Sequence, residues 1–234
     1  MTFENSYWNS GSVFDLYRAE NPERALIQPI IAGMVNRLRP ARVLDFGCGD
    51  AYVERLIDSD ITVDLFDKNV SALEQAHKLL NRPNCNVILN DDQLCSHVYD
   101  CIILSFVLVC VESEEEQERI LKTLKGVKTE GGTLIMANTH PCFLQYNFAA
   151  FETSFDQESF PYLKEGLPYE VTIKQPDHKP SITFTDYHWT FSFWVNKAIE
   201  CGFDLAEIVE VADRPYKDLH GNDLYPPFLI MNFR

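Results

Sequence analysis

Residues 43–52, with the sequence VLDFGCGDAY, constrain the fold more than any other stretch of this chain. An apolar run leads into an acid, Asp45, and then into a Gly-x-Gly turn made by Gly47 and Gly49. Glycines let a backbone turn tightly and let a ligand approach it, and a helix after such a turn presents unpaired N–H groups. The stretch therefore predicts a strand, a tight turn and a nucleotide-shaped pocket.

The residues around this turn narrow the class of ligand. Dinucleotide-binding folds read GxGxxG, and the third glycine permits close packing of helix on strand. Tyr52 stands at that position here and is too bulky for it. Asp45 lies shortly before the first glycine, where an acid suits a cationic ligand without phosphates better than a pyrophosphate. An NAD-linked oxidoreductase is therefore the less favoured alternative.

Strand-like and helix-like segments alternate along the first 140 residues. We expect strands at residues 42–46, 61–66, 87–89, 101–106 and 133–137. Helices are expected from the residues 21–23 onward, at about 50–58, after Asn69 or Ser71, and after Ser113, which forms a capping box with Glu116. Such alternation means right-handed crossovers and a parallel sheet covered on both faces.

Residues 141–181 break this alternation. They show no clean period but many aromatic side chains, namely Phe143, Tyr146, Phe148, Phe151, Phe155, Phe160, Tyr162 and Tyr169. A mostly apolar wall is how small ligands are held, so a lid over a substrate is the preferred interpretation, and a dimer interface is the alternative. Regular elements resume with strands at 182–184, 205–211 and 228–233 and a helix from about 191 to Cys201-Gly202.

Acids stand where the predicted strands end, at the edge where ligands bind in open α/β sheets. Asp67 follows Gly49 by 18 residues, close to the spacing at which an acid binds a ribose in nucleotide-binding units. A solvated loop acid is the alternative. Residues 90–92 (NDD) are a second candidate for the ligand, or a plain polar turn.

Residues 40–140 resemble the class I S-adenosylmethionine-dependent methyltransferases, whose first motif is an apolar strand followed by D/ExGxGxG. The departure is Ala51, a small residue at the third glycine. The resemblance implies a Rossmann-like α/β fold, a seven-stranded sheet of order 3-2-1-4-5-7-6 with the last strand antiparallel. It also implies S-adenosylmethionine as the cofactor and S-adenosylhomocysteine as its product.

The same resemblance implies roles for single residues. Asp67 matches the acid that holds both ribose hydroxyls, Asp91 or Asp92 the acid near the adenine amino group, and Ser105 a position near the methionine portion. Gln93 is expected to offer a backbone N–H to the adenine ring. The full set of expected cofactor contacts is Asp45, Gly47, Cys48, Gly49, Asp67, Lys68, Asp91, Asp92, Gln93, Ser105 and Tyr17.

One methyltransferase domain is expected over residues 1–234, with a helical flap at 1–40 and the lid at 141–181. In similar methyltransferases such a flap covers the cofactor. The flap residues that would touch it, or simply pack, are Tyr7, Trp8, Tyr17 and Arg18.

His140 is the candidate general base, because it follows the fifth strand and precedes Pro141 at the rim of the expected pocket. Histidine accepts protons near neutral pH. A structural role in the turn is the alternative. Substrate contacts are expected from Tyr187 and His188 and from the lid residues Phe143 and Tyr146, with plain packing as the alternative.

The chain has a formal net charge of −15, which repels polyanions and disfavours nucleic acid and anionic membranes as partners. No apolar run is long enough for a membrane span, and residues 1–10 lack the basic region of a signal peptide, so a cytoplasmic location is expected. The seven cysteines are scattered without a CxxC pair, which favours reduced thiols over disulfides or a metal site.

These features together predict an enzyme that transfers a methyl group from S-adenosylmethionine to an oxygen or nitrogen of a small molecule. A binding protein that keeps the cofactor pocket without turnover, as a regulator or partner subunit, is the alternative from a different class. The sequence does not identify the acceptor, and it leaves monomer and homodimer both open.

Overall fold

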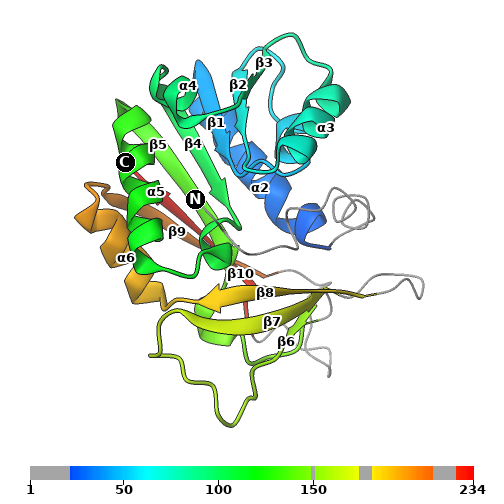
Figure 1. Ribbon diagram of the computed structural model, residues 1–234, viewed down its shortest axis with the longest axis vertical. Coiled ribbons are helices and arrows are strands. Elements are labelled where there is room, and N and C mark those ends of the chain that lie inside the picture. The colour runs from blue at the N-terminus through cyan, green and yellow to red at the C-terminus, as the bar shows by residue number, and fades with distance from the viewer. Residues whose placement is uncertain (1–21, 149–150, 174–180, 213–224) are drawn as a thin grey trace.

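The computed structural model describes residues 22–148, 151–173, 181–212 and 225–234. Its centre is a seven-stranded sheet with the order β3-β2-β1-β4-β5-β10-β9 (Figure 1). The strands are β1 (Arg42–Phe46), β2 (Thr62–Phe66), β3 (Cys85–Ile88), β4 (Tyr99–Ser105), β5 (Lys128–Thr139), β9 (Leu205–Val211) and β10 (Phe228–Phe233).

The strands from β3 to β5 run parallel, and β10 runs antiparallel to both of its neighbours, β5 and β9. Counted within this sheet alone, β9 and β10 are the sixth and seventh strands. The order is then the predicted 3-2-1-4-5-7-6 with an antiparallel last strand, and the α/β fold class is confirmed. The numbering differs only because the strands of a second sheet intervene.

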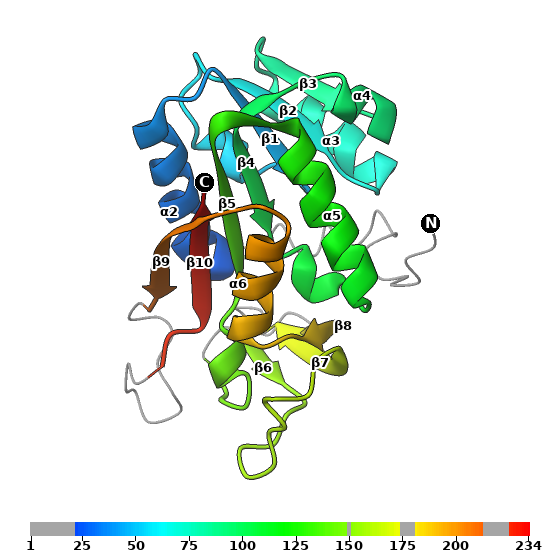
Figure 2. The same ribbon diagram turned by 90° about the vertical axis from the view of Figure 1, so that its left-hand side faces the viewer.

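Helices cover both faces of this sheet (Figure 2). On one face α2 (Pro22–Leu38) and α3 (Val70–Leu80) bury apolar residues such as Ile31 and Leu73 against β1 and β2. On the other face α4 (Asp91–Cys95), α5 (Glu114–Val127) and α6 (Phe191–Glu200) pack residues such as Leu121 and Trp194 against β4 and β5. The centre of β4 is fully buried, as expected of a parallel strand covered on both sides.

A second sheet of three antiparallel strands, β6 (Phe151–Thr153), β7 (Leu167–Ile173) and β8 (Ile182–His188), lies across the carboxyl end of the main sheet (Figure 1). Buried residues of β7, among them Tyr169 and Val171, belong to the same apolar cluster as α2. The segment predicted as an irregular lid is therefore partly regular. It extends past residue 181, because β8 pairs along its whole length with β7.

Several predicted boundaries were wrong. The helix expected at 50–58 is only a short 3-10 turn, η1 (Val53–Arg55), and the third strand begins at Cys85 rather than 87. Residues 90–92 are not a plain turn, because Asn90 caps α4. The fifth strand starts at Lys128, before the two glycines that were expected to precede it.

Candidate functional site

The Gly-x-Gly turn is held tightly against its neighbours. Gly47 has φ +83°, and its N–H donates to the carbonyl of Phe66 at 2.7 Å. A Cβ atom at Gly47 would lie 2.3 Å from Cγ2 of Val107, so only glycine fits. Gly49 (φ +54°) and Ala51 (φ +52°) also take the left-handed conformation. The turn thus keeps the backbone of a three-glycine motif, although an alanine in this conformation costs about 1–2 kcal/mol.

Asp67 follows β2 and reaches across to this turn. One oxygen of its carboxylate accepts the N–H of Gly49 at 2.8 Å, and the other accepts the N–H of Asn69 at 2.8 Å. Burial raises the pKa of Asp67, and these two hydrogen bonds oppose the rise. Each carboxylate oxygen has a second lone pair, so the group can hold the loop and still accept hydrogen bonds from a hydroxyl pair.

Glu54 is a buried acid that sequence reasoning missed. It lies on η1 next to Asp45, and the two side chains are only 1% and 4% exposed. The two carboxyl groups lie within hydrogen-bonding reach of each other. Burial is the main cause that raises the pKa of both groups. At Asp45 the charge of Glu54 and the hydrogen bond with it raise the pKa further, followed by the negative charges of Asp67 and Asp50. The floor of the turn is therefore rich in carboxyl groups and suits a cationic ligand. No spacing signal in the sequence reveals this pair.

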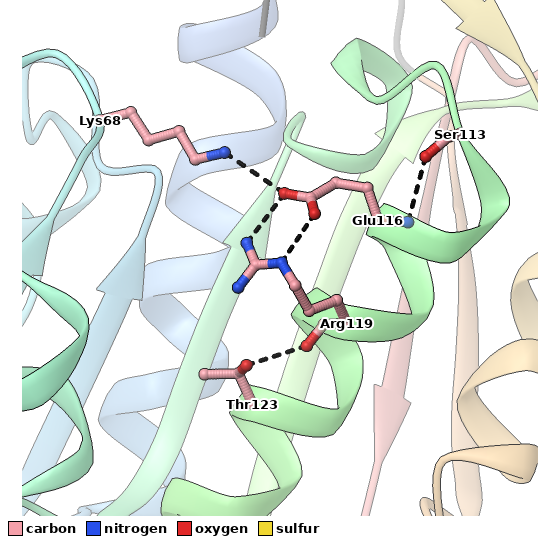
Figure 3. A network of polar contacts seen from close by, with 5 residues as sticks. All are labelled: Lys68, Ser113, Glu116, Arg119 and Thr123. Atoms are coloured by element: carbon pink, nitrogen blue, oxygen red, sulfur yellow. Dashed lines mark hydrogen bonds and ion pairs between the residues drawn. The ribbon is translucent and has the colours of Figure 1, made fainter. Parts of the chain in front are cut away.

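Lys68 extends from the loop after β2 toward α5 (Figure 3). Its Nζ lies 3.4 Å from Oε1 of Glu116, whose carboxylate is also held by Arg119 at 2.7 and 2.8 Å. Ser113 accepts the N–H of Glu116, so half of the predicted capping box forms, while the Glu116 side chain turns to the two cations. The predicted cofactor contact Lys68 thus fixes the Asp67 loop to α5.

Asp91 and Asp92 are exposed at the start of α4, near the carboxyl end of β3. Gln93 is engaged within the helix start. Its N–H donates to Oδ1 of Asn90 at 2.9 Å, and its side-chain oxygen accepts the N–H of Leu89 at 2.8 Å. The carboxylates of Asp91 and Asp92 therefore face solvent, whereas the backbone N–H of Gln93 is already used.

Ser105 ends β4 and is half-buried, at the sheet edge that the Gly-x-Gly turn shares. The next residue, Phe106, has φ +56°, which is unusual for a bulky side chain. Its N–H donates to the carbonyl of Ala137 at 2.8 Å, and its ring packs edge-on against Phe228 at 5.7 Å. Strain of this kind gathers at binding sites, and no pattern in the sequence indicates it.

His140 is 5% exposed and has partners at both ring nitrogens. Nδ1 accepts the N–H of Cys142 at 3.3 Å, and Nε2 lies 3.1 Å from Oε1 of Glu210 on β9. Burial lowers the pKa of His140, although the hydrogen bond to Glu210 and its negative charge oppose this. A base role stays a prediction that requires Nδ1 to release the Cys142 N–H.

The lid residues Phe143 and Tyr146 lie in one aromatic group with His140. The ring of Phe143 is 4.6 Å from that of His140, and Tyr146 stacks on Tyr225 at 4.0 Å. Tyr225, just before β10, was not singled out in the sequence. The group forms a wall beside the end of β5.

Tyr187 and His188 end β8 and point to different surroundings. The Tyr187 hydroxyl lies 3.5 Å from Oε2 of Glu112. His188 is buried, its Nε2 lies 2.7 Å from the carbonyl of Tyr162, and its Nδ1 has no partner in the described part of the chain. The rings of Phe155 and Phe160 surround it at 6.0 and 5.0 Å.

A buried polar cluster joins the two sheets, and sequence reasoning missed most of it. It consists of Thr139 at the end of β5, Tyr169 on β7 and Asp186 on β8, with the half-buried Cys110 of the short turn η2 (Leu108–Cys110) beside them. Asp186 stands directly before the two residues predicted to touch substrate. In the sequence Asp186 stands in a strand with several other polar residues, so it resembles an acid that faces solvent. Only the pairing of β7 with β8 shows that its side chain points inward.

Tyr17, and with it Tyr7, Trp8 and Arg18, lies outside the described residues. Within the described ranges no three His, Cys, Asp or Glu side chains come together as metal ligands would. None of the described helices is both long enough and apolar enough to cross a bilayer.

Comparison with known proteins agrees with this geometry. Residues 18–164 match the family model described as tellurite resistance protein TehB. The methyltransferase CcbJ from Streptomyces caelestis superposes with a TM-score of 0.68 at 14% identity, over 100% of this chain and 99% of that one. An S-adenosylmethionine-dependent methyltransferase from Clostridium acetobutylicum gives 0.64 at 8% identity, over 94% of each chain. DhpI in complex with SAH gives 0.59 at 14% identity, over 99% of this chain and 95% of that one.

No curated protein sequence matches the chain. The fold is that of the class I S-adenosylmethionine-dependent methyltransferases, as the sequence predicted. Within that class, the match over more than half of its length shows that the chain belongs to the TehB family.

Proposed function

We propose that this protein binds S-adenosylmethionine at the Gly-x-Gly turn and methylates a small molecule at oxygen or nitrogen. The observation that carries this proposal is the left-handed turn at residues 47–51, locked to Asp67 by a hydrogen bond of 2.8 Å. A turn of this shape next to an acid suits a nucleoside whose ribose donates hydrogen bonds and which carries no phosphate.

The residues around the turn fit such a cofactor. Asp67 has lone pairs left for ribose hydroxyls, and the buried pair of Asp45 and Glu54, which keeps one proton, offers its remaining negative charge to a cation. Asp91 and Asp92 are exposed at the rim of the site, where the adenine amino group is expected. When bound, S-adenosylmethionine supplies an activated methyl group on a sulfonium.

The chain itself contributes alignment and exclusion of water, which are the main sources of rate in such a displacement. The second sheet lies across the carboxyl end of the main sheet, where it covers the side on which the acceptor must enter. Its inner surface carries Tyr169 and the rings around His188. A cover of this kind, mostly apolar with a few polar groups, supports an acceptor of moderate size.

A calorimetric comparison tests the cofactor. We expect S-adenosylmethionine and S-adenosylhomocysteine to bind the purified protein, and NADH not to bind. Binding of NADH alone would overturn the proposal. The two variants to compare at the site are Asp67→Asn and Asp92→Asn. The first removes the charge of a partly buried acid that holds the loop, and the second removes the charge of an exposed acid at the expected adenine rim.

A cofactor-binding regulator without turnover is the second candidate, and the aromatic surface of the lid would then hold a partner protein. Methyl transfer to any member of a broad acceptor panel excludes it. Tellurite belongs in that panel because of the name of the family model. The carboxyl-rich site and the net charge of −15 disfavour an oxyanion as acceptor.

A further inference from the structure

We propose that cofactor binding at the Gly-x-Gly turn expels a proton from the buried pair of Asp45 and Glu54, so that the site takes up a positively charged group of the cofactor in exchange for a proton. This inference rests on the proposed function and adds a property of the same site that binding alone does not require. The exchange takes place beneath the turn and involves no residue of the acceptor side.

Asp45 and Glu54 come together from two elements beneath the turn. Asp45 lies near the end of β1, and Glu54 lies on η1, shortly after the Gly-x-Gly turn. The two residues are 4% and 1% exposed, and their carboxyl groups lie within hydrogen-bonding reach of each other. Two carboxyl groups so close together and so deeply buried cannot both ionise without a large cost. One proton is therefore shared by the pair.

The neighbouring acids strengthen the hold of the pair on this proton. Burial raises the pKa of Asp45 most, and its partner carboxyl group raises it further through its charge and the hydrogen bond between them. The negative charges of Asp67 and Asp50 follow. Two thiols on this side of the sheet stay neutral, because burial raises the pKa of Cys85 to about 11 and that of Cys101 to about 12.

The two arginines nearest to the pair are engaged by other groups. Arg82 donates at 2.7 to 3.3 Å to four backbone carbonyls, those of Glu54, Ile57, Asp58 and Ile61. Its charge affects the pKa of Glu54 less than burial does. Arg55 lies 3.6 Å from the carboxylate of Asp50. The helix α2, which packs against η1, adds apolar side chains such as Ile31. In the described part of the chain, the negative charge of the pair is thus not matched by an ion pair.

This negative charge reaches the turn itself. Asp45 stands two residues before Gly47, and Cys48 lies between the two glycines. Burial raises the pKa of the Cys48 thiol most, and the charges of Asp67, Asp45 and Glu54 raise it further, in that order. A cation bound over the turn would be exposed to the same charges, since charges in a buried surrounding are screened little.

Cofactor binding exchanges one positive charge for another. Without the cofactor, the pair carries one proton and one negative charge. A cationic group of the cofactor, its sulfonium or its ammonium, lowers the pKa of the shared proton by the same attraction with which it binds. The O–H bond breaks, its electron pair stays on the carboxylate and the proton passes to solvent. The pair then carries two negative charges opposite the cation.

The exchange fixes the direction of the pH dependence. The free site binds more protons than the occupied site, so the affinity for the cofactor rises as pH rises through the raised pKa values of the pair. Below those values the proton competes with the cofactor. For one exchanged proton, the dissociation constant can change by at most about tenfold per pH unit.

Calorimetry of the wild-type protein in buffers of different ionisation enthalpy counts the released protons. S-adenosylmethionine and S-adenosylhomocysteine are titrated in phosphate and in imidazole. We expect about 0.3 to 1 proton to leave at about pH 6.5, and the dissociation constant of S-adenosylmethionine to fall at least about threefold from pH 5.5 to pH 7. Release with both ligands identifies the ammonium as the exchanged cation. Release with S-adenosylmethionine alone identifies the sulfonium, because only this charge distinguishes the two ligands.

Glu54→Gln tests whether the pair is the source of the proton. The glutamine amide has nearly the same shape and can donate a hydrogen bond to Asp45, but it carries no titrating proton. The number of released protons should fall below half of the wild-type value, and the dissociation constant should depend less on pH. Asp45→Asn also leaves a single carboxyl group and should lower the proton count in the same way.

Asp58→Asn is the matched control for these variants. It removes an exposed acid on the same connection, four residues after Glu54, and should release as many protons as the wild type.

The two proposals fail in different ways. A protein that binds neither ligand refutes the proposed function. Binding without proton release in the wild type, or release with S-adenosylhomocysteine alone, refutes the exchange and leaves the proposed function intact. Unchanged proton release in a folded Glu54→Gln or Asp45→Asn variant shows that another group gives up the proton, and overturns the role of the pair.

Discussion

Asp67 and Gly49, one after β2 and the other after β1, are joined by a hydrogen bond of 2.8 Å from the glycine N–H to a carboxylate oxygen. The acid expected to hold a ribose therefore also fixes the shape of the loop that surrounds it. If Asp67 holds the ribose as we propose, binding and local folding are coupled at this single side chain, because the same carboxylate sets the loop conformation.

Asp67→Ala should for this reason weaken cofactor binding more than the loss of a ligand contact alone. A hydrogen bond to a charged group contributes about 1.5–3 kcal/mol, which corresponds to roughly a 10- to 100-fold rise in the dissociation constant of S-adenosylhomocysteine. Calorimetry on the variant checks this. Affinity within threefold of the wild type would show that the acid serves only the fold.

Gly47→Ala should destabilise the protein, since the new Cβ would lie 2.3 Å from Cγ2 of Val107 and φ is +83°. We expect a loss of about 1–3 kcal/mol in the free energy of unfolding. The double variant Gly47→Ala/Val107→Ala relieves the clash and should recover part of the loss relative to Val107→Ala alone. Gly126→Ala in α5 is the control, because nothing lies within 4 Å of its Cβ. Equal effects at the two glycines would contradict the tight turn.

Glu54→Gln should change how stability depends on pH. Burial raises the pKa of Glu54 and Asp45 above their ordinary values of 4.5 and 3.8. The folded pair therefore keeps a proton that the unfolded chain has lost. Its contribution to stability is complete below the ordinary pKa values and is lost as pH rises through the raised ones.

The melting temperature of the wild type should accordingly fall more between pH 5 and pH 8 than that of Glu54→Gln. We expect a difference of roughly 2–4 °C, the shift for about 1 kcal/mol in a chain of this size. Glu115→Gln changes an exposed acid on α5 and should follow the wild type. Parallel curves for all three proteins would show that the pair is not a special proton site.

His140→Asn tests whether His140 acts as a general base or has only a structural role in the turn. The asparagine oxygen can still accept the N–H of Cys142, which His140 accepts at 3.3 Å, but it cannot take up a proton. Because both ring nitrogens already have partners, we expect turnover to stay within about threefold of the wild type. A loss of 100-fold or more, the size typical of a removed general base, would restore the catalytic role predicted from the sequence.

The sequence predicted the parts of the fold that depend on local chemistry. Glycines at 47 and 49 and the apolar run of β4 have direct conformational consequences, so they predicted the turn and the parallel sheet, whereas the strand order was predicted only from the resemblance to the methyltransferases. The length of the helix after the turn was not predicted. Ala51 adopts φ +52°, a conformation that an alanine in the sequence does not indicate, and the expected helix is reduced to η1.

Pairing between distant segments explains what was missed at the site. Glu54 meets Asp45, and Asp186 meets Tyr169, only once the chain has folded. Residues 169–173 of β7 do alternate between apolar and polar, a signal that the sequence analysis did not use, whereas β8 was hidden because its inward-facing positions include the polar residues Asp186 and His188. The many aromatic residues of this segment correctly indicated that it is partly buried, but they did not indicate that it forms a sheet.

The second sheet is one continuous excursion of the chain between β5 and α6, whereas the Gly-x-Gly turn and Asp67 belong to the first half of the main sheet. The proposed donor site and the proposed acceptor cover therefore come from separate stretches of sequence. Mutation can remodel the excursion without disturbing the loop that we propose binds the methyl donor. A domain built in this way can take up new acceptors in evolution, or by grafting of the excursion in the laboratory, while its donor chemistry stays the same.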